Sequence, residues 1–137
     1  MIKRIVTASL LASLSWVAPA APQQQIDCGY PLNRDERQFC AEQTLAEAEA
    51  DMNASFESAF AKLRALDPTL PEQLQGSFAA LEEAQISWRA FRQKDCDAYA
   101  GPFRAGEDGE MAFLGCMILQ TRQRSDQLSA MIDDYGG

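Results

Sequence analysis

The sequence predicts an all-α protein, a small disulfide-linked bundle of three helices in which a long antiparallel hairpin packs against a third helix. Apolar residues recur at intervals of three, four or seven over three long stretches, which places them on one face of a helix. Segments rich in proline and glycine separate these stretches, and no run of alternating apolar and polar residues indicates a strand. A chain of 137 residues with four cysteines suits one domain with two cross-links.

Residues 1–20 have the composition of a secretory signal peptide. Lys3 and Arg4 provide a positively charged start, residues 5–17 carry no charge, and Ala18-Pro19-Ala20 supplies the small residues of a cleavage site. The uncharged stretch is shorter than the about 20 residues that a membrane-spanning helix needs. We therefore expect cleavage after Ala20, a periplasmic or secreted protein with no membrane insertion, and a single mature domain over residues 21–137.

The first helix is predicted to begin after Asn33 and to end at Asp67. Asn33 and Glu36 have the spacing of a capping box, in which each side chain accepts a hydrogen bond from a free backbone amide of the other. Pro68 disfavours the helical conformation at the residue before it. The residues expected on the inner face follow the helical period: Phe39, Leu45, Met52, Phe56, Phe60, Leu63 and Leu66.

A second helix is expected to start at Thr69, which forms another capping-box pattern with Glu72, and to end near residues 96–99. The short connection makes these two helices antiparallel. Residues 100–109 contain three glycines and one proline and are expected to form a loop, followed by a third helix over residues 108–134. The expected inward residues are Leu74, Phe78, Leu81, Trp88 and Phe91 in the second helix and Met111, Leu114, Ile118, Leu128 and Ile132 in the third.

The four cysteines are predicted to form two structural disulfides, because an even number in a small exported chain favours cross-links over free thiols. No two of them have the CxxC spacing of a zinc knuckle or a thioredoxin-type redox site. The antiparallel geometry brings Cys40, Cys96 and Cys116 to one end of the bundle. We favour the pairs Cys28–Cys40 and Cys96–Cys116, which attach each adjoining loop to a helix. The alternative is Cys40–Cys96 with Cys28–Cys116.

The composition argues against an enzyme and against a nucleic-acid-binding protein. The chain has no histidine, which excludes Ser-His-Asp and Cys-His catalytic sites and zinc sites built on histidine. Its 20 acidic and 12 basic residues give a net charge of −8, and loss of residues 1–20 makes it −10. Such a chain is a poor partner for nucleic acid or anionic lipid. No cofactor or metal is expected, because the acidic cluster Glu107-Asp108-x-Glu110 lacks the ligand series of a calcium loop.

One face of the second helix combines an amide, an indole, a guanidinium and a sulfur, from Gln85, Trp88, Arg92 and Cys96. A buried arginine needs an acceptor, and Asp51 in the first helix is the expected partner of Arg92, with Asn53 hydrogen-bonding in the same layer. We interpret these residues as a structural polar layer rather than a ligand site. Arg124 lies on a similar face of the third helix, where we interpret it as a cation favoured by the helix C-terminus and neighbouring acids.

In their order and spacing, three groups of residues resemble the LprI-like lysozyme-inhibitor domain family. The groups are Asp27-Cys28 with Glu36, Cys40 and Asp51-x-Asn53-x-x-Phe56; Ala84-Gln85-x-x-Trp88-x-x-x-Arg92-x-x-x-Cys96; and Cys116 with Thr121-x-x-Arg124-x-x-x-Leu128. The resemblance covers about residues 27–132. One departure is Phe56, where the family often has tyrosine, so this position lacks a hydroxyl group.

This resemblance implies a secreted or periplasmic helical domain, some of whose relatives inhibit lysozyme. The residues that match the family motif, as scaffold or as binding surface, are Asp51, Asn53, Gln85, Trp88, Arg92 and Arg124. The implied function is that of a non-enzymatic inhibitor whose partner is a basic lysozyme. The alternative is a periplasmic interaction or scaffolding module of the cell envelope that has no lysozyme activity.

Inhibition of a lysozyme requires an element that reaches the two carboxylates of the enzyme's cleft. The segment from Tyr99 to Arg104 combines aromatic residues and one cation with a Gly-Pro turn. We therefore regard Tyr99, Phe103 and Arg104 as candidate residues for contact with the partner.

Overall fold

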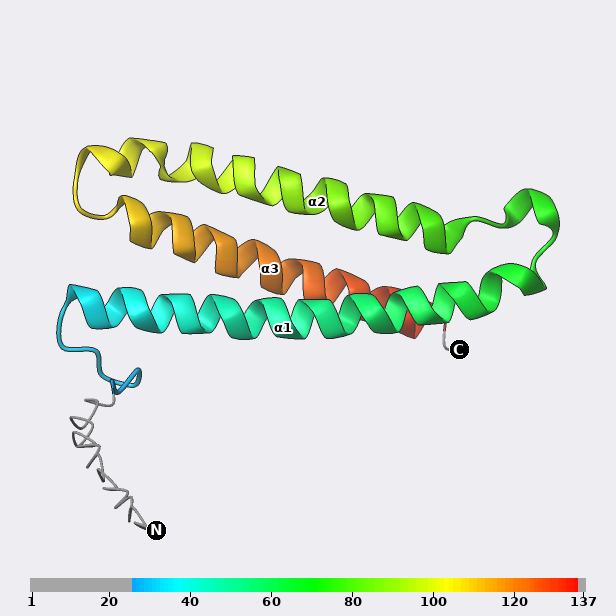
Figure 1. The fold of residues 1–137 in the computed structure, drawn as a ribbon, viewed down its shortest axis with the longest axis horizontal. Coiled ribbons are helices and arrows are strands. Elements are labelled where there is room, and N and C mark those ends of the chain that lie inside the picture. The colour runs from blue at the N-terminus through cyan, green and yellow to red at the C-terminus, as the bar shows by residue number, and fades with distance from the viewer. Residues whose placement is uncertain (1–25, 136–137) are drawn as a thin grey trace, which may run out of the picture.

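The computed structural model describes residues 26–135, which form three long helices arranged up, down and up (Figure 1). Helix α1 spans Arg34–Leu66, α2 spans Ser77–Ala100 and α3 spans Gly109–Asp134. Short 3-10 turns at Asp67–Thr69, Glu72–Leu74 and Gly101–Ala105 connect them, and the described residues contain no strand. The predicted all-α fold is thus confirmed. The expected signal peptide, residues 1–20, lies outside the described residues.

The start of α1 is set by local hydrogen bonds. The side chain of Asn33 accepts from the backbone N–H of Glu36 at 2.9 Å, which confirms the predicted N-cap. The carboxylate of Glu36 accepts a hydrogen bond from the backbone N–H of Leu32 at 2.6 Å, whereas in a capping box it would accept from the N–H of Asn33, one residue later. The acids Asp35 and Glu36 in the first turn also suit the positive end of the helix dipole.

The second helix begins at Ser77, so the predicted start at Thr69 is wrong. Gly76 stands before it with a φ of 110°, a conformation that glycine adopts without strain. The buried carboxylate of Asp67 accepts hydrogen bonds from the backbone N–H groups of Gly76 at 2.8 Å and Phe78 at 3.5 Å. The cap of α2 therefore comes from the end of α1, whereas the hydroxyl of Thr69 donates to the carbonyl of Leu66 at 2.7 Å.

The connection between α2 and α3, which was expected to be a loop over residues 100–109, contains the 3-10 turn Gly101–Ala105. Tyr99 lies in the last turn of α2, and Phe103 and Arg104 lie in the 3-10 turn. Gly109 starts α3 against this turn, where an added Cβ would lie 2.8 Å from Cγ and 2.9 Å from Cα of Arg104. A glycine is required there because the backbones approach too closely for a side chain.

The core lies where α3 packs against both other helices, parallel to α1 and antiparallel to α2 (Figure 1). It is formed by Met52, Ala59, Leu63, Leu81 and Leu128, with Phe56, Phe60, Phe78, Trp88, Met131 and Ile132 packed against them. Phe60 links two helices, since its ring lies 5.8 Å from the ring of Phe78, edge to face. None of the helices in residues 26–135 is long and apolar enough to cross a bilayer.

Three residues expected in the core, Phe39, Leu74 and Phe91, are exposed. Leu74 belongs to a 3-10 turn, so the helical period that placed it inward does not apply. Phe91 is one residue before the buried Arg92 and therefore points about 100° away from the interior. Phe39 lies two turns into α1 and is 40% exposed, close to the end of the bundle.

Two disulfides connect the described cysteines, Cys28–Cys40 and Cys96–Cys116, with Cα–Cα distances of 5.4 and 5.5 Å. The first attaches the segment before α1 to the second turn of that helix. The second joins the C-terminal part of α2 to the N-terminal part of α3. This is the favoured pairing of the two considered, and each bond closes a short stretch of the chain.

Candidate functional site

A buried polar layer crosses the middle of the bundle and contains several of the family-motif residues. Arg92 of α2 is only 6% exposed. Its guanidinium donates hydrogen bonds to Thr121 Oγ1 of α3 at 2.6 Å and to Glu49 Oε1 of α1 at 2.8 Å. The Glu49 contact is also an ion pair. One arginine therefore links all three helices.

The expected partner of Arg92, Asp51, is not in this layer. Asp51 is exposed, because it follows Glu49 by two residues and points about 200° away from it around the helix. Asn53 is also exposed, and its Oδ1 accepts a hydrogen bond from Arg89 at 2.6 Å outside the layer. Glu49 was missed although it stands three residues before Met52, which places it on the same face of the helix as the predicted inward residues.

Gln85 and Trp88 complete the layer. The amide of Gln85 donates to Met52 Sδ at 2.9 Å and accepts from Arg124 Nε at 3.0 Å. Two guanidinium groups lie over the Trp88 ring, with Cζ of Arg92 4.9 Å and Cζ of Arg124 5.9 Å from its centroid. Cations over an aromatic face are attracted to it, so these contacts add to the hydrogen bonds.

Arg124 has a different role from the one expected. It lies ten residues before Asp134, the last residue of α3, and the helix dipole acts only within the final turn. Its guanidinium instead binds Gln85 and faces Trp88. Partial burial lowers the pKa of the Arg124 side chain. The structure thus brings four of the six motif residues together and leaves Asp51 and Asn53 on the surface.

The layer has the chemistry of a structural link. Arg92, Gln85 and Thr121 are buried among core side chains, and Nε of Arg92 has no hydrogen-bond partner among the described residues. Within residues 26–135 no three Cys, Asp or Glu side chains are placed to hold a metal ion. The arrangement joins the helices in one register through donors and acceptors that an apolar core would not specify.

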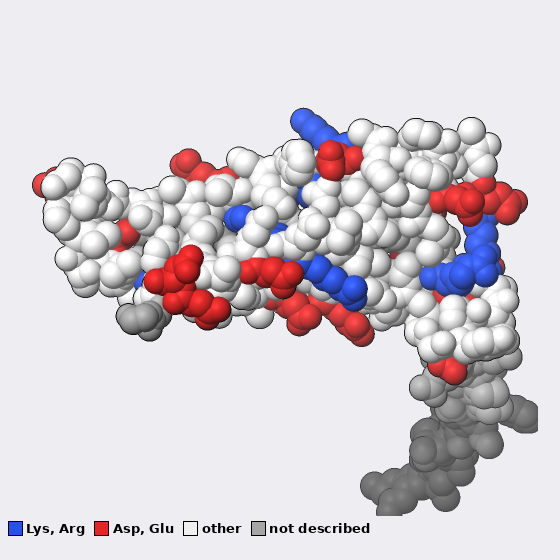
Figure 2. Space-filling model, turned by 180° about the vertical axis from the view of Figure 1, so that it is seen from behind, with Lys and Arg blue, Asp and Glu red and all other residues white. Residues whose placement is uncertain are grey.

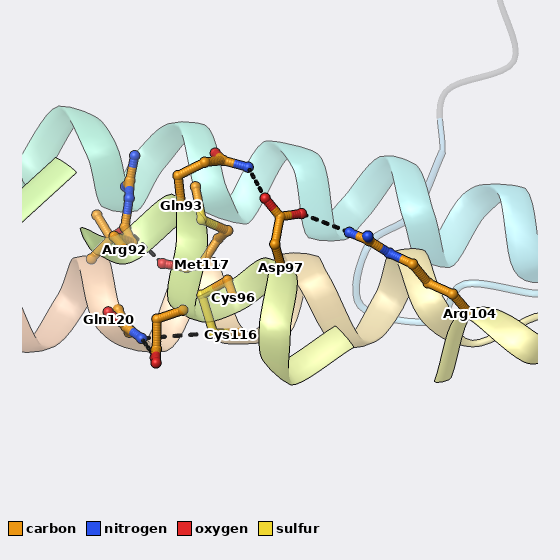
Figure 3. Close-up of a disulfide and its surroundings, with 10 residues drawn as sticks. Arg92, Gln93, Cys96, Asp97, Arg104, Cys116, Met117 and Gln120 are labelled. Atoms are coloured by element: carbon orange, nitrogen blue, oxygen red, sulfur yellow. Dashed lines mark hydrogen bonds and ion pairs between the residues drawn. A yellow bond between two sulfur atoms is a disulfide. The ribbon is translucent and has the colours of Figure 1, made fainter. Parts of the chain in front are cut away.

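The candidate contact residues form an exposed turn at the disulfide end of the bundle. The rings of Tyr99 and Phe103 lie 5.7 Å apart, and Arg104 Nη2 lies 2.7 Å from Asp97 Oδ1 (Figure 3). Asp97 also accepts from Gln93 Nε2 at 3.2 Å. The hydrogen bonds from Arg104 and Gln93 hold the pKa of Asp97 below its ordinary value. We name Tyr99, Phe103 and Arg104 the aromatic turn.

On the face of the molecule that Figure 2 shows, charged side chains lie in separate groups rather than in one large patch. Figure 2 shows several small acidic groups along one face and no extended basic surface. The end of the bundle also carries an ion pair between Arg34 and Glu107, with Nη1 and Oε2 3.7 Å apart. An acidic protein of this kind favours a positively charged partner.

Comparison with known proteins identifies the family. A protein from Rhizobium meliloti (strain 1021), named "Uncharacterized protein R02472", is 28% identical over 134 residues, which cover 95% of this chain and 96% of that relative. No solved structure matches the chain. Residues 29–128, which contain most of the bundle and the whole polar layer, match the family described as "Lysozyme inhibitor LprI". The chain therefore belongs to the LprI lysozyme-inhibitor family.

Proposed function

We propose that the protein is an exported, non-enzymatic inhibitor that binds lysozyme-type muramidases. The observation that supports this most directly is the family match over residues 29–128. The two disulfides suit an oxidising compartment outside the cytoplasm, as do the features of residues 1–20. In this proposal residues 21–137 are the mature domain.

Electrostatics favours such a partner. The mature chain has a net charge of −10, and animal lysozymes are basic, so long-range attraction accelerates their encounter. Attraction of this kind weakens with salt and acts on any basic protein. Specific inhibition therefore needs a defined contact surface in addition to charge.

We propose that the aromatic turn forms part of that contact surface. Its two rings are exposed beside one cation, and muramidase clefts contain two carboxylates that a cation can approach. Arg104 is already paired with Asp97, so it must leave Asp97 or share its donors to bind a carboxylate of the enzyme. Replacement Arg104→Glu is expected to weaken inhibition, and unchanged inhibition would remove Arg104 from the contact.

A second candidate function is a periplasmic interaction or scaffolding module with no lysozyme activity. One observation favours it: Gln85 and Arg92, which belong to the family motif, are buried and link helices. A motif of this kind describes a scaffold, and different members of a family can use one scaffold to bind different partners.

Titration of purified, oxidised residues 21–137 against muramidases of different classes tests the proposal. The assay is run at about 0.15 M salt, where the Debye length is about 8 Å, to suppress nonspecific attraction. We expect inhibition that saturates when about one molecule of the protein is present per molecule of enzyme. An unrelated acidic protein of similar charge is the control. A folded chain that inhibits no muramidase class would favour the scaffolding function.

A further inference from the structure

A groove between α2 and α3 exposes three large apolar side chains beside one another. Phe91 and Tyr99 of α2 and Leu119 of α3 are 57%, 56% and 58% exposed, and all three line a groove of about 640 Å³. Gln120 and Gln123 provide polar groups along it. Contiguous apolar surface with polar residues around it is typical of an interaction site on a soluble protein.

The groove is open partly because α3 has a glycine there. Gly115 lines the groove, and a Cβ built on it would meet no atom within 4 Å. Unlike Gly109, it is not required by a close backbone approach. A glycine inside a helix costs about 0.5–1 kcal/mol relative to alanine, so α3 is less stable than it could be at this position. A larger residue would stabilise the helix and occupy the groove.

A carboxylate in the groove indicates what kind of partner surface can bind there. Asp95 is the carboxylate that lines it, and its Oδ2 accepts a hydrogen bond from Gln120 Nε2 (Figure 3 shows Gln120 beside the disulfide). Among residues 26–135, no Lys or Arg nitrogen lies within 4.0 Å of the Asp95 carboxylate. A negative charge beside exposed aromatic rings complements a surface on which a lysine or arginine stands next to an apolar side chain.

We infer that the α2–α3 groove, lined by Phe91, Asp95, Tyr99, Gly115 and Leu119, is the surface on which the muramidase docks. The enzyme inserts an aliphatic or aromatic side chain over Gly115, and a neighbouring lysine or arginine pairs with Asp95. Tyr99 belongs both to the groove and to the aromatic turn, so the two form one continuous surface. This inference rests on the proposed function and names the contact surface for it.

Substitution Gly115→Leu tests the inference without weakening the fold. A helical leucine side chain leans toward the preceding turn, here over Met111, which also lines the groove. We expect the melting temperature to rise, because leucine is the better helix former. We expect inhibition to weaken by at least about tenfold, as blocking a central pocket of an interface does. Loss of inhibition with increased stability cannot come from unfolding.

Two control variants isolate the effect of filling the groove. Gly115→Ala gives most of the gain in helix stability but adds only one methyl group, so inhibition should weaken less than in Gly115→Leu. Ala54→Leu places the same leucine on an exposed position of α1, away from the groove, and should leave inhibition unchanged. If Gly115→Leu and Ala54→Leu inhibit equally well, the groove is not the docking surface.

Asp95→Asn tests the charge separately. Asparagine can still accept from Gln120, so only the charge is removed. Inhibition should weaken and should depend less on salt than that of the wild type. An unchanged salt dependence would exclude Asp95 from the contact.

The outcomes separate failure of the inference from failure of the proposed function. A wild-type chain that inhibits no muramidase overturns the proposed function together with the inference. A wild-type chain that inhibits, with Gly115→Leu equally active, overturns the inference alone. Analytical ultracentrifugation of the wild type and of Gly115→Leu identifies self-association of the chain. A wild-type dimer that Gly115→Leu converts to an active monomer would make the groove a contact between copies of this chain.

Discussion

The carboxylate of Asp67 accepts a hydrogen bond from the backbone N–H of Gly76, nine residues later, at 2.8 Å. This bond fixes the turn between α1 and α2 and supplies the cap that the first residues of α2 lack. Asp67 is almost fully buried, so water does not readily take the place of its carboxylate as the hydrogen-bond acceptor. The side chain of Asp67 therefore connects the end of α1 to the start of α2.

Asp67→Ala is expected to destabilise the protein by about 0.5–2 kcal/mol, because it removes the side-chain acceptor for the backbone N–H groups at the start of α2. Urea unfolding followed by circular dichroism measures the change. Glu57→Ala, which replaces an exposed acid in α1, is the control and should shift stability by less than about 0.5 kcal/mol. Equal effects of the two variants would contradict a capping role for Asp67.

Arg92→Met should cost about 2 kcal/mol of stability while leaving inhibition by the folded protein unchanged. The substitution removes the hydrogen bonds to Thr121 and Glu49. We expect less than the full cost of breaking a buried ion pair, because the Glu49 side chain is 38% exposed and can be hydrated.

Arg89→Met is the matched control for the polar layer, since it removes an exposed hydrogen bond to Asn53 from the same helix. It should cost no more than about 0.5 kcal/mol. Chemical denaturation and muramidase inhibition are measured for both variants. A stable Arg92→Met protein that no longer inhibits would instead assign Arg92 to the contact with the partner.

The Asp97–Arg104 pair predicts a dependence of stability on acid pH. The folded pKa of Asp97 lies below its ordinary value of 3.8, so this pair adds stability above that value. The contribution is lost as pH falls through the folded pKa. The melting temperature of Arg104→Gln should therefore fall below that of the wild type at neutral pH, and the difference should shrink below about pH 4.

Carbon-13 NMR titration of the Asp97 carboxyl group checks the cause directly, since its pKa should rise in Arg104→Gln. A difference in melting temperature of equal size at pH 3 and pH 7 would show that Arg104 acts through packing instead. The effect should be small and should decrease with added salt, because both side chains are about half exposed.

Replacement of Cys96 and Cys116 together by alanine should lower stability by about 3 kcal/mol, since the bond closes a loop of 20 residues between two helices. The double alanine variant at Cys28 and Cys40 should lose less, because that bond attaches only the short segment before α1. Guanidinium unfolding of the two variants compares them. A larger loss at Cys28 and Cys40 would mean that this segment stabilises the bundle.

Features encoded by neighbouring residues could be predicted from the sequence, and features that depend on packing could not. Asn33 caps α1 through a residue three positions away, so its pattern is visible in the sequence. The cap of α2 comes from Asp67, and no short motif relates that residue to Gly76. The capping-box pattern at Thr69 gave a wrong start for α2, because Pro71 and Gly76 interrupt the helix that would begin there.

The polar layer was foreseen in its α2 residues but not in its α1 partner. Spacing placed Gln85, Trp88 and Arg92 on one face, as the structure has them. The choice between Asp51 and Glu49 depends on the rotation of α1 about its axis, which the core positions of Met52 and Leu63 set. The exposure of Phe91 depends in the same way on the rotation of α2 about its axis as it packs against α3.

Neither disulfide links α1 to α2 or α3, and this determines what a proteolytic cut does to the protein. Cys28–Cys40 lies wholly before and within α1, and Cys96–Cys116 connects α2 to α3. A single cut in residues 67–76 thus divides the protein into two pieces that no covalent bond holds together, even without a reducing agent. A cut in residues 101–108 leaves one covalently connected molecule. After a cut at the α1–α2 joint, α1 is therefore held to α2 and α3 only by noncovalent packing.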